Sequence, residues 1–259
     1  MALQLNDKNP LVKKWQQFLN LQGFNCGEPS GNFDQKTFTA TKNFQQYYNI
    51  QQTGEAGSIT LGKAHQLGFN PEKEPGNDQI KSDKELLQWI KANLSGIMKQ
   101  AVSGMPYTED WLAGMCARET GFKIVSYINQ GHDFNFICTN MKGDYGQRKG
   151  DPGPIYHGYG FWQIDIASYP DFVASGAWQD PLATAKQAVA VLNEKRNFLE
   201  YVEKQLSPID FERAVTAAYN CGQGNVMKAI HNKSDFDCYT YHGDYSQEVF
   251  RYRGIYRML

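Results

Sequence analysis

The stretch TEDWLAGMCARETG, residues 108–121, has the pattern of an amphipathic helix with one carboxylic acid on its apolar face. Thr108 is a favourable N-cap residue, and Gly121 is typical of the position just after a helix C-terminus. The apolar side chains between them recur at the spacing of a stripe that faces a core: Trp111, Leu112, Met115 and Cys116. Glu119 continues this stripe.

The position of Glu119 predicts an unusual acidity. Burial disfavours the ionised carboxylate, and the negative C-terminal end of the helix dipole acts in the same direction. We therefore expect a raised pKa and a carboxylic acid that can donate a proton near neutral pH. On spacing alone, a glutamate that turns out to solvent at a frayed helix end is the alternative.

The composition is that of an ordinary globular protein of 259 residues, with room for more than one domain. No apolar run is long enough to span a membrane, so we expect no membrane insertion. A net charge of −1 argues against binding to nucleic acid. The five cysteines and five histidines lack metal-ligand spacing, so no metal and no cofactor are expected. We interpret the cysteines as mostly reduced, with a disulfide among the last four left open, and the protein as a monomer.

Residues 1–69 contain the helix and turn signals of a small helical domain. Helices are predicted over residues 10–22, 35–48 and 58–67, with a turn-rich segment at 25–34. The motifs PSGNFDQKT (29–37) and TGEAGSIT (53–60) resemble the three-helix peptidoglycan-binding domain, and the likeness covers residues 9–68. The resemblance implies that this domain holds cell-wall polymer and carries no chemistry, although Ser30 replaces the usual aspartate. A helical scaffold that binds nothing is the alternative.

The remaining chain is predicted to be mainly α-helical. Residues 70–81 form a polar linker, and Ser82 with Glu85 makes a capping box at the start of a second domain, 82–259. Residues 121–180 look irregular, with a short hairpin around 156–166, and a long irregular insertion of this kind is usually functional. Helices are predicted after the Asp180-Pro181 pair and over residues 210–221 and 244–256. The expected fold class is therefore mainly α, a small three-helix domain followed by an α-rich domain.

Three further acids follow Glu119 in turn-prone surroundings: Asp144, Asp151 and Asp165. The segment HGYGFWQID, residues 157–165, combines glycines that permit close approach of a ligand with the rings of Tyr159, Phe161 and Trp162. Aromatic faces suit sugar rings, and carboxylates beside them suit glycosidic cleavage. Each aspartate could instead be a turn former, and the aromatic residues could belong to the core.

Five motifs occur in the order seen in goose-type lysozymes, which share the lysozyme-like superfamily with soluble lytic transglycosylases. They are RETGF (118–122), GDYG (143–146), HGYGFWQID (157–165), AYNCGQGNV (218–226) and DYSQEV (244–249). The resemblance spans residues 86–256. It implies a lysozyme-like fold and cleavage of the β-1,4 bond between N-acetylmuramic acid and N-acetylglucosamine in peptidoglycan.

Carried over by position, the resemblance makes Glu119 the general acid. Asp165 matches the acid that helps to place the attacking water. Asp144 and Asp151 are both candidates for the second water-positioning acid, because the insertion QRKGDPGPIY (147–156) separates Asp144 from the glycine-rich segment. We favour Asp144, which keeps the GDYG context.

The remaining matches are expected to contact substrate. Tyr219 and Asn220 match a Tyr-Asn pair beside the scissile bond, although Tyr219 could equally be a core residue. Gln163 is expected to line the groove, together with Tyr159, and Tyr245 matches a tyrosine near the catalytic glutamate.

Three alternatives to a muramidase remain open: a lytic transglycosylase that forms 1,6-anhydro-muramic ends, a chitinase-like enzyme, and a wall-binding protein with a degenerate site. The first residues, MALQLNDKNPLVKKW, lack the pattern of a secretory signal peptide. We therefore expect an endolysin-like protein that reaches the wall from a host cytoplasm through a holin, or by another delivery route.

Overall fold

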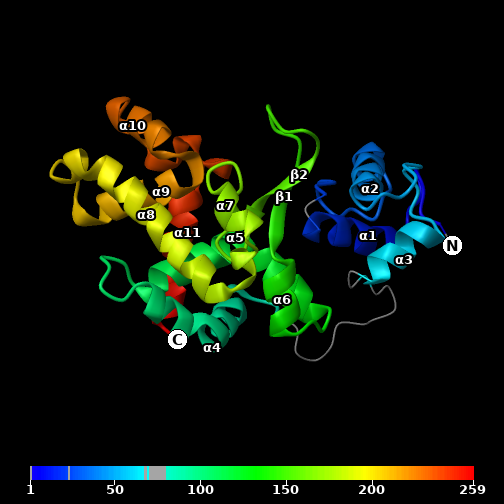
Figure 1. The fold of residues 1–259 in the computed structure, drawn as a ribbon, viewed down its shortest axis with the longest axis horizontal. Coiled ribbons are helices and arrows are strands. Elements are labelled where there is room, and N and C mark those ends of the chain that lie inside the picture. The colour runs from blue at the N-terminus through cyan, green and yellow to red at the C-terminus, as the bar shows by residue number, and fades with distance from the viewer. Residues whose placement is uncertain (1, 23, 67–68, 70–79) are drawn as a thin grey trace. The chain divides into compact units, whose positions relative to one another are not determined.

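A computed structural model of the chain describes residues 2–22, 24–66, 69 and 80–259 (Figure 1). The helices are α1 (Pro10–Leu21), α2 (Gln35–Tyr47), α3 (Ser58–Gln66), α4 (Asp83–Ala101), α5 (Glu109–Asn129), α6 (Phe134–Asn140), α7 (Pro170–Ala174), α8 (Pro181–Glu203), α9 (Pro208–Cys221), α10 (Gln223–His231) and α11 (Tyr245–Arg257). The strands are β1 (Lys142–Gly146), β2 (Ile155–Tyr159) and β3 (Ile164–Asp165). The predicted mainly α fold class is confirmed. None of the described helices is both long enough and apolar enough to cross a membrane.

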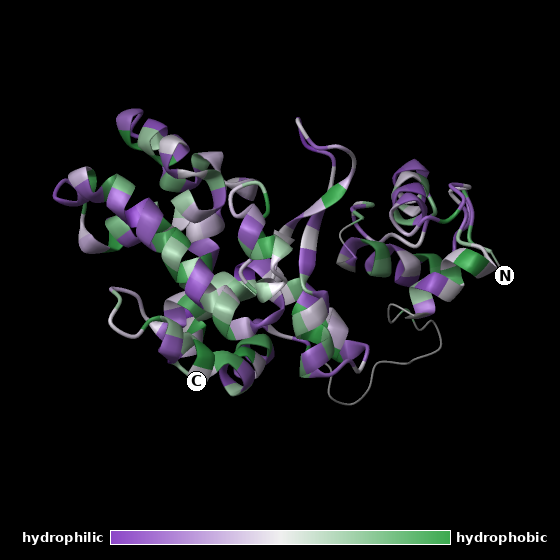
Figure 2. Cartoon of the chain, viewed as in Figure 1, coloured by the Kyte–Doolittle hydropathy of each residue, from purple (hydrophilic) through white to green (hydrophobic). Residues whose placement is uncertain are grey.

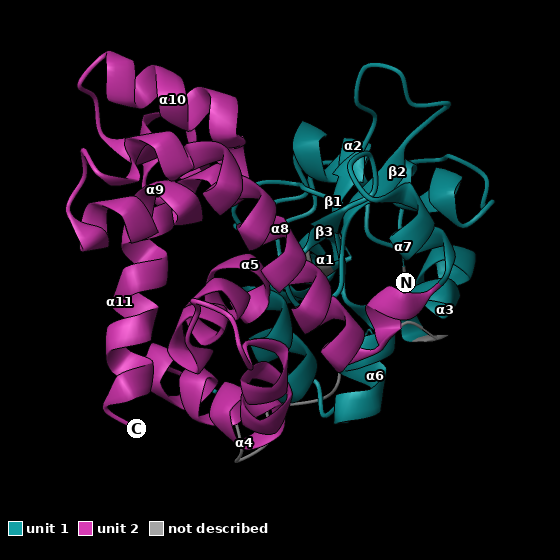
Figure 3. Cartoon of the chain, turned by 60° about the vertical axis from the view of Figure 1, so that its left-hand side comes forward, with its two compact units in different colours: residues 1–80, 122–175 teal, residues 81–121, 176–259 magenta. Residues whose placement is uncertain are grey.

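Contacts divide the chain into two compact units (Figure 3). The first unit contains residues 1–80 and 122–175, and the second contains residues 81–121 and 176–259. The segment 122–175 thus packs with the N-terminal residues, whereas the predicted boundaries follow the order of the chain. Most of the predicted linker, residues 70–79, lies outside the described residues.

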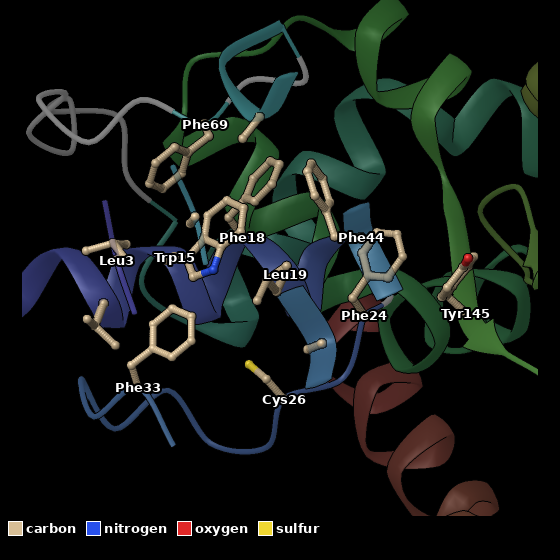
Figure 4. Close-up of a cluster of buried hydrophobic side chains, with 14 of the residues drawn as sticks. Leu3, Trp15, Phe18, Leu19, Phe24, Cys26, Phe33, Phe44, Phe69 and Tyr145 are labelled. Atoms are coloured by element: carbon tan, nitrogen blue, oxygen red, sulfur yellow. The ribbon is translucent and has the colours of Figure 1, made fainter. Parts of the chain in front are cut away.

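The N-terminal helices of the first unit form where sequence signals predict them. The side chain of Asn9 caps α1 by accepting a hydrogen bond from the Val12 N–H (2.9 Å), and Asp34 caps α2 in the same way. Their apolar faces enclose a core dominated by aromatic rings, which include Trp15, Phe18, Phe24, Phe33 and Phe44 (Figure 4). Gly23, the residue after the predicted helix over residues 10–22, lies outside the described residues.

The same core continues into the sheet of the first unit. The three strands are antiparallel in the order β1-β2-β3, with Tyr145 paired with Tyr156. Both tyrosines belong to the buried cluster around Phe24, and Tyr145 lies 4.3 Å from Phe24 between ring centroids (Figure 4). The prediction of a hairpin around residues 156–166 is confirmed by the pairing of β2 with β3. The prediction that residues 121–180 are irregular is wrong, because they contain part of α5, α6, three strands and α7.

The predicted end of the Glu119 helix at Gly121 is also wrong, because α5 continues to Asn129. Gly121 does not have the positive φ of a helix stop. A Cβ atom at Gly121 would lie only 2.7 Å from Cδ2 of Leu86 on α4. The glycine is therefore needed for close approach of α4 to α5 and does not terminate the helix.

The second unit is built from amphipathic helices, along which hydrophobic and hydrophilic residues alternate (Figure 2). The Ser82 cap of α4 is confirmed, because its hydroxyl accepts from the Glu85 N–H (3.2 Å). The Glu85 carboxylate accepts from the Lys81 N–H (2.6 Å), one residue before the Ser82 N–H that a capping box uses. Asp180 caps α8 and Pro181 is its first residue, as predicted. Helix α10 is absent from the prediction, and it begins immediately after Gly222, which has a φ of 82°.

A buried arginine ties three helices of this unit together. Arg253 on α11 pairs with Asp110 on α5 (3.1 Å) and with Glu212 on α9 (2.9 Å). Only 5% of Arg253 is exposed, so these two carboxylates are needed to offset the cost of burying its positive charge. The network fixes α11 against α5, the helix that carries Glu119.

Candidate active site

Glu119 lies partly buried within α5, and its carboxylate accepts a hydrogen bond from the hydroxyl of Tyr245 on α11. Burial raises the pKa of Glu119 from 4.5 to about 7, although the hydrogen bond from Tyr245 and the positive charge of Arg118 act against this rise. The predicted direction is confirmed. The helix dipole is not its cause, because α5 continues to Asn129 and the dipole acts only near a helix end. Near neutral pH, a large share of Glu119 is protonated and able to donate a proton.

A buried aspartate places Tyr245, the first residue of α11. Asp237 is fully buried, and its carboxylate accepts hydrogen bonds from the Ser246 N–H (2.8 Å), the Ser246 hydroxyl (2.7 Å) and the Gln247 N–H (3.2 Å). These backbone groups belong to the first turn of α11, where N–H groups lack partners within the helix. Asp237 therefore caps α11 from outside. Sequence reasoning misses it, because its partners lie nine and ten residues further along the chain.

The other predicted residues of the second unit lie around the segment that precedes α11. Arg118 pairs with Asp244 (2.8 Å), and the exposed side chain of Asn220 accepts a hydrogen bond through Oδ1 from the Tyr241 N–H (3.0 Å). Tyr219 is partly buried and lies near Tyr245. The pKa of Tyr245 is raised mainly by burial, next by the charge of Glu119 and then by Tyr219. The second unit thus contains the candidate acid and three of the residues predicted to contact substrate, Tyr219, Asn220 and Tyr245, whereas Tyr159 and Gln163 belong to the first unit.

The predicted water-positioning acids lie together in the first unit. Asp144 is on β1, at a left-handed φ of 52°, and Asp165 ends β3. The guanidinium of Arg148 bridges them, 2.5 Å from Asp144 Oδ2 and 2.6 Å from Asp165 Oδ1. The N–H and hydroxyl of Ser168 both donate to the other oxygen of Asp165, at 2.9 Å each. One guanidinium therefore holds both carboxylates in place and offsets their mutual repulsion.

Asp151 has a different set of partners. Its carboxylate accepts a hydrogen bond from the Arg148 N–H (2.6 Å) and lies 2.8 Å from Nε2 of the buried His157, whose Nδ1 lies 2.7 Å from the Asp144 carbonyl oxygen. The hydrogen bond with His157 is the main reason that the pKa of Asp151 is lowered. Asp151 therefore braces the loop that presents Arg148. Of the two candidates, Asp144 is the one that Arg148 joins to Asp165.

The structure places Gln163 inside the turn between β2 and β3. Gln163 has a positive φ of 48°, and its amide donates to the Gly160 carbonyl oxygen (2.9 Å). A Cβ atom at Gly143 or at Gly158 would collide with Oε1 of Gln163. Gly158 therefore makes room for the Gln163 side chain, whereas its predicted role is to permit close approach of a ligand.

The aromatic residues of the HGYGFWQID segment are mainly structural. Phe161 and Trp162 are buried, so their interpretation as faces for a sugar is wrong and the core alternative holds. Tyr159 is half-buried and packs against the N-terminal core. Burial explains this outcome, because a ring enclosed by protein offers no face to a polysaccharide.

In the part of the chain that the structure describes, no group of three or more histidine, cysteine, aspartate or glutamate residues could hold a metal ion. All five cysteines are free thiols in the structure.

Comparison with known proteins identifies the first of the predicted domains. A protein-family model described as "Putative peptidoglycan binding domain" matches residues 8–63, which contain α1, α2 and part of α3. A search of curated proteins finds no match to the chain. The chain therefore carries an N-terminal peptidoglycan-binding domain, which associates it with the bacterial cell wall.

Proposed function

We propose that this protein is a muramidase that cleaves the β-1,4 bond between N-acetylmuramic acid and N-acetylglucosamine in peptidoglycan. The observation that carries the proposal is Glu119, a partly buried carboxylic acid with a pKa of about 7 and a tyrosine hydroxyl bound to its oxygen. The N-terminal domain supports peptidoglycan as the partner.

In the proposed reaction, Glu119 protonates the glycosidic oxygen as positive charge develops on the anomeric carbon of the bond that is cleaved. Asp144 and Asp165 accept hydrogen bonds from a water molecule and orient it toward the opposite face of the sugar. As the water oxygen bonds to the anomeric carbon and the glycosidic C–O bond breaks, one of these two carboxylates takes a proton from the water. Such a reaction inverts the anomeric configuration. It requires the acid and the base about 6.5–9.5 Å apart, so that the water fits between base and sugar.

Arg148 supports the hydrolytic form of this reaction. A lytic transglycosylase needs no water, since the C6 hydroxyl of muramic acid attacks in its place. A guanidinium that holds two carboxylates together has a clear use when both must orient one water molecule. Asp144 and Asp165 are therefore assigned to water positioning, and Arg148 to holding them.

The proposed organisation follows the predicted boundaries, with residues 1–69 holding the wall and residues 82–259 carrying out the cleavage. The protein acts as a monomer without a cofactor. It reaches the wall from a host cytoplasm through a holin, or by another delivery route.

The test is mass spectrometry of the soluble fragments released from purified peptidoglycan by the wild type and by Glu119→Gln. Fragments with free reducing muramic acid, absent from the variant digest, are expected. Anhydro-muramic ends would reassign the protein as a lytic transglycosylase. A variant that releases fragments at the wild-type rate would remove Glu119 from the mechanism.

A further inference from the structure

The segment Tyr241–Asp244, directly before α11, presents two aromatic rings to solvent. Tyr241 is 66% exposed, and His242 is also exposed. The two rings form a pair, with centroids 3.9 Å apart and planes tilted by 57°. An aromatic ring with one face open to solvent is a suitable surface for the apolar C–H face of a sugar.

Hydrogen bonds hold this ring pair in place. Asn220 accepts from the Tyr241 N–H (3.0 Å), and the guanidinium of Arg118 donates both to the Tyr241 carbonyl oxygen (3.4 Å) and to Asp244 (2.8 Å). On the buried side, the Thr240 hydroxyl donates to the Asp237 carbonyl oxygen (2.9 Å). An exposed ring on an anchored loop loses little freedom when a ligand binds, which favours affinity.

The backbone of His242 has a left-handed φ of 64°. Residues with a side chain populate this region sparsely, and such conformations gather at binding and catalytic sites. The next residue, Gly243, also has a positive φ, of 72°.

The ring pair is continuous with the candidate acid through residues of the same unit. Arg118, which binds the Tyr241 carbonyl oxygen, precedes Glu119 in α5. Tyr245, four residues after Tyr241, donates its hydroxyl hydrogen to Glu119. The hydrogen bonds of Arg118 and Tyr245 therefore connect the ring pair to Glu119 within the second unit.

We infer that Tyr241 and His242 form a saccharide-binding platform that takes one N-acetylhexosamine ring of the glycan strand, beside the sugar at Glu119. The apolar C–H face of the sugar lies on the Tyr241 ring, and the imidazole of His242 can exchange hydrogen bonds with a hydroxyl or acetamido group. This inference rests on the proposed function. It also changes the predicted role of Asn220, which acts by positioning Tyr241.

The test uses the full chain carrying Glu119→Gln and titrates it with chitotetraose, a β-1,4-linked N-acetylglucosamine tetramer. Binding is followed by NMR at the Cε1–H signal of His242, which a His242→Gln variant identifies among the five histidines. This signal reports on the platform and not on the N-terminal domain. It should shift in a saturable way.

Tyr241→Ala in the same background should raise the Kd for chitotetraose about tenfold, a loss of about 1.4 kcal/mol of binding free energy. Tyr241→Phe, which keeps the ring, should stay within about twofold. The matched control is Tyr201→Ala on α8, whose side chain is 61% exposed and outside the platform, and its Kd should be unchanged. An immobile His242 signal, or equal Kd values for Tyr241→Ala and its parent, would overturn the inference.

Failure of the proposed function has a separate signature. If the wild type releases no fragments from peptidoglycan while Tyr241→Ala still weakens chitotetraose binding, the muramidase assignment is wrong and the platform stands. If fragments appear and Tyr241→Ala leaves both the Kd and the KM unchanged, the platform is wrong and the muramidase assignment stands.

Discussion

Glu119 should make the folded protein less stable as the pH rises, and Glu119→Gln should remove this effect. Burial raises the pKa of Glu119 from 4.5 to about 7. At 1.36 kcal/mol for each pH unit between these values, ionising Glu119 in the folded protein costs about 3 kcal/mol. A glutamine side chain at this position would still accept the hydrogen bond from Tyr245 but could not ionise.

The sign follows from proton binding. Between pH 4.5 and pH 7 the unfolded chain has released the Glu119 proton while the folded protein keeps it, so the free energy of unfolding falls as the pH rises through this window. Below it, neutral glutamate and glutamine are nearly equivalent. Glu119→Gln should therefore match the wild type near pH 4 and exceed it by about 3 kcal/mol near pH 8.

The assay is urea unfolding of the wild type and Glu119→Gln at each pH. The quantity compared is the change of the unfolding free energy with pH in each protein. The matched control is Glu200→Gln on α8, where the side chain is exposed and the substitution should have little effect at either pH. The reasoning would be refuted by a Glu119→Gln effect of equal size at pH 4 and pH 8, or by none at pH 8.

Three further predictions concern catalysis and packing. Because protonated Glu119 is the proposed acid, kcat/KM should fall as the pH rises through about 7. Tyr245→Phe should move this fall to higher pH, because it removes a hydrogen bond that favours the ionised form of Glu119. A pH–rate profile that moves to lower pH would contradict this role of Tyr245. Arg148→Gln should lower kcat by about 10- to 100-fold, since it releases both aspartates, while a pelleting assay shows unchanged binding to peptidoglycan; full activity in this variant would remove Arg148 from the site. Gly121→Ala should cost about 1–3 kcal/mol, measured by urea unfolding, because its Cβ would lie 2.7 Å from a leucine of α4. Gly96→Ala on the same α4, where a Cβ meets nothing within 4 Å, should instead stabilise the protein by about 0.5–1 kcal/mol.

Local signals predicted the helices well wherever a cap and an apolar stripe coincided. Ser82 and Asp180 each cap a helix through a side-chain oxygen that accepts a nearby N–H, so three or four residues of sequence contain the whole interaction. Prediction failed where the role of a glycine depended on a contact with a residue distant in the chain. Gly121 looks like a helix stop in sequence, and only the nearby Leu86 shows that it serves packing.

The candidate site shows the same division. The apolar stripe of residues 111–116 indicated that Glu119 is partly buried, and burial alone explains the raised pKa. Arg148 lies within residues 147–156, which are predicted to be an insertion, and no local pattern shows that its guanidinium reaches Asp165, seventeen residues further along.

The sequence by itself therefore determined the capped helices and the unusual acidity of Glu119, because caps, stripes and burial act over one or two helical turns. It also determined the N-terminal peptidoglycan-binding domain, through motifs shared with that family. Only the tertiary structure decided that Asp144 shares Arg148 with Asp165, that Asp237 caps α11, and that Tyr241 stays exposed. Hydrogen bonds and ion pairs of this kind join residues that are distant in the chain, and their geometry exists only after the chain has folded.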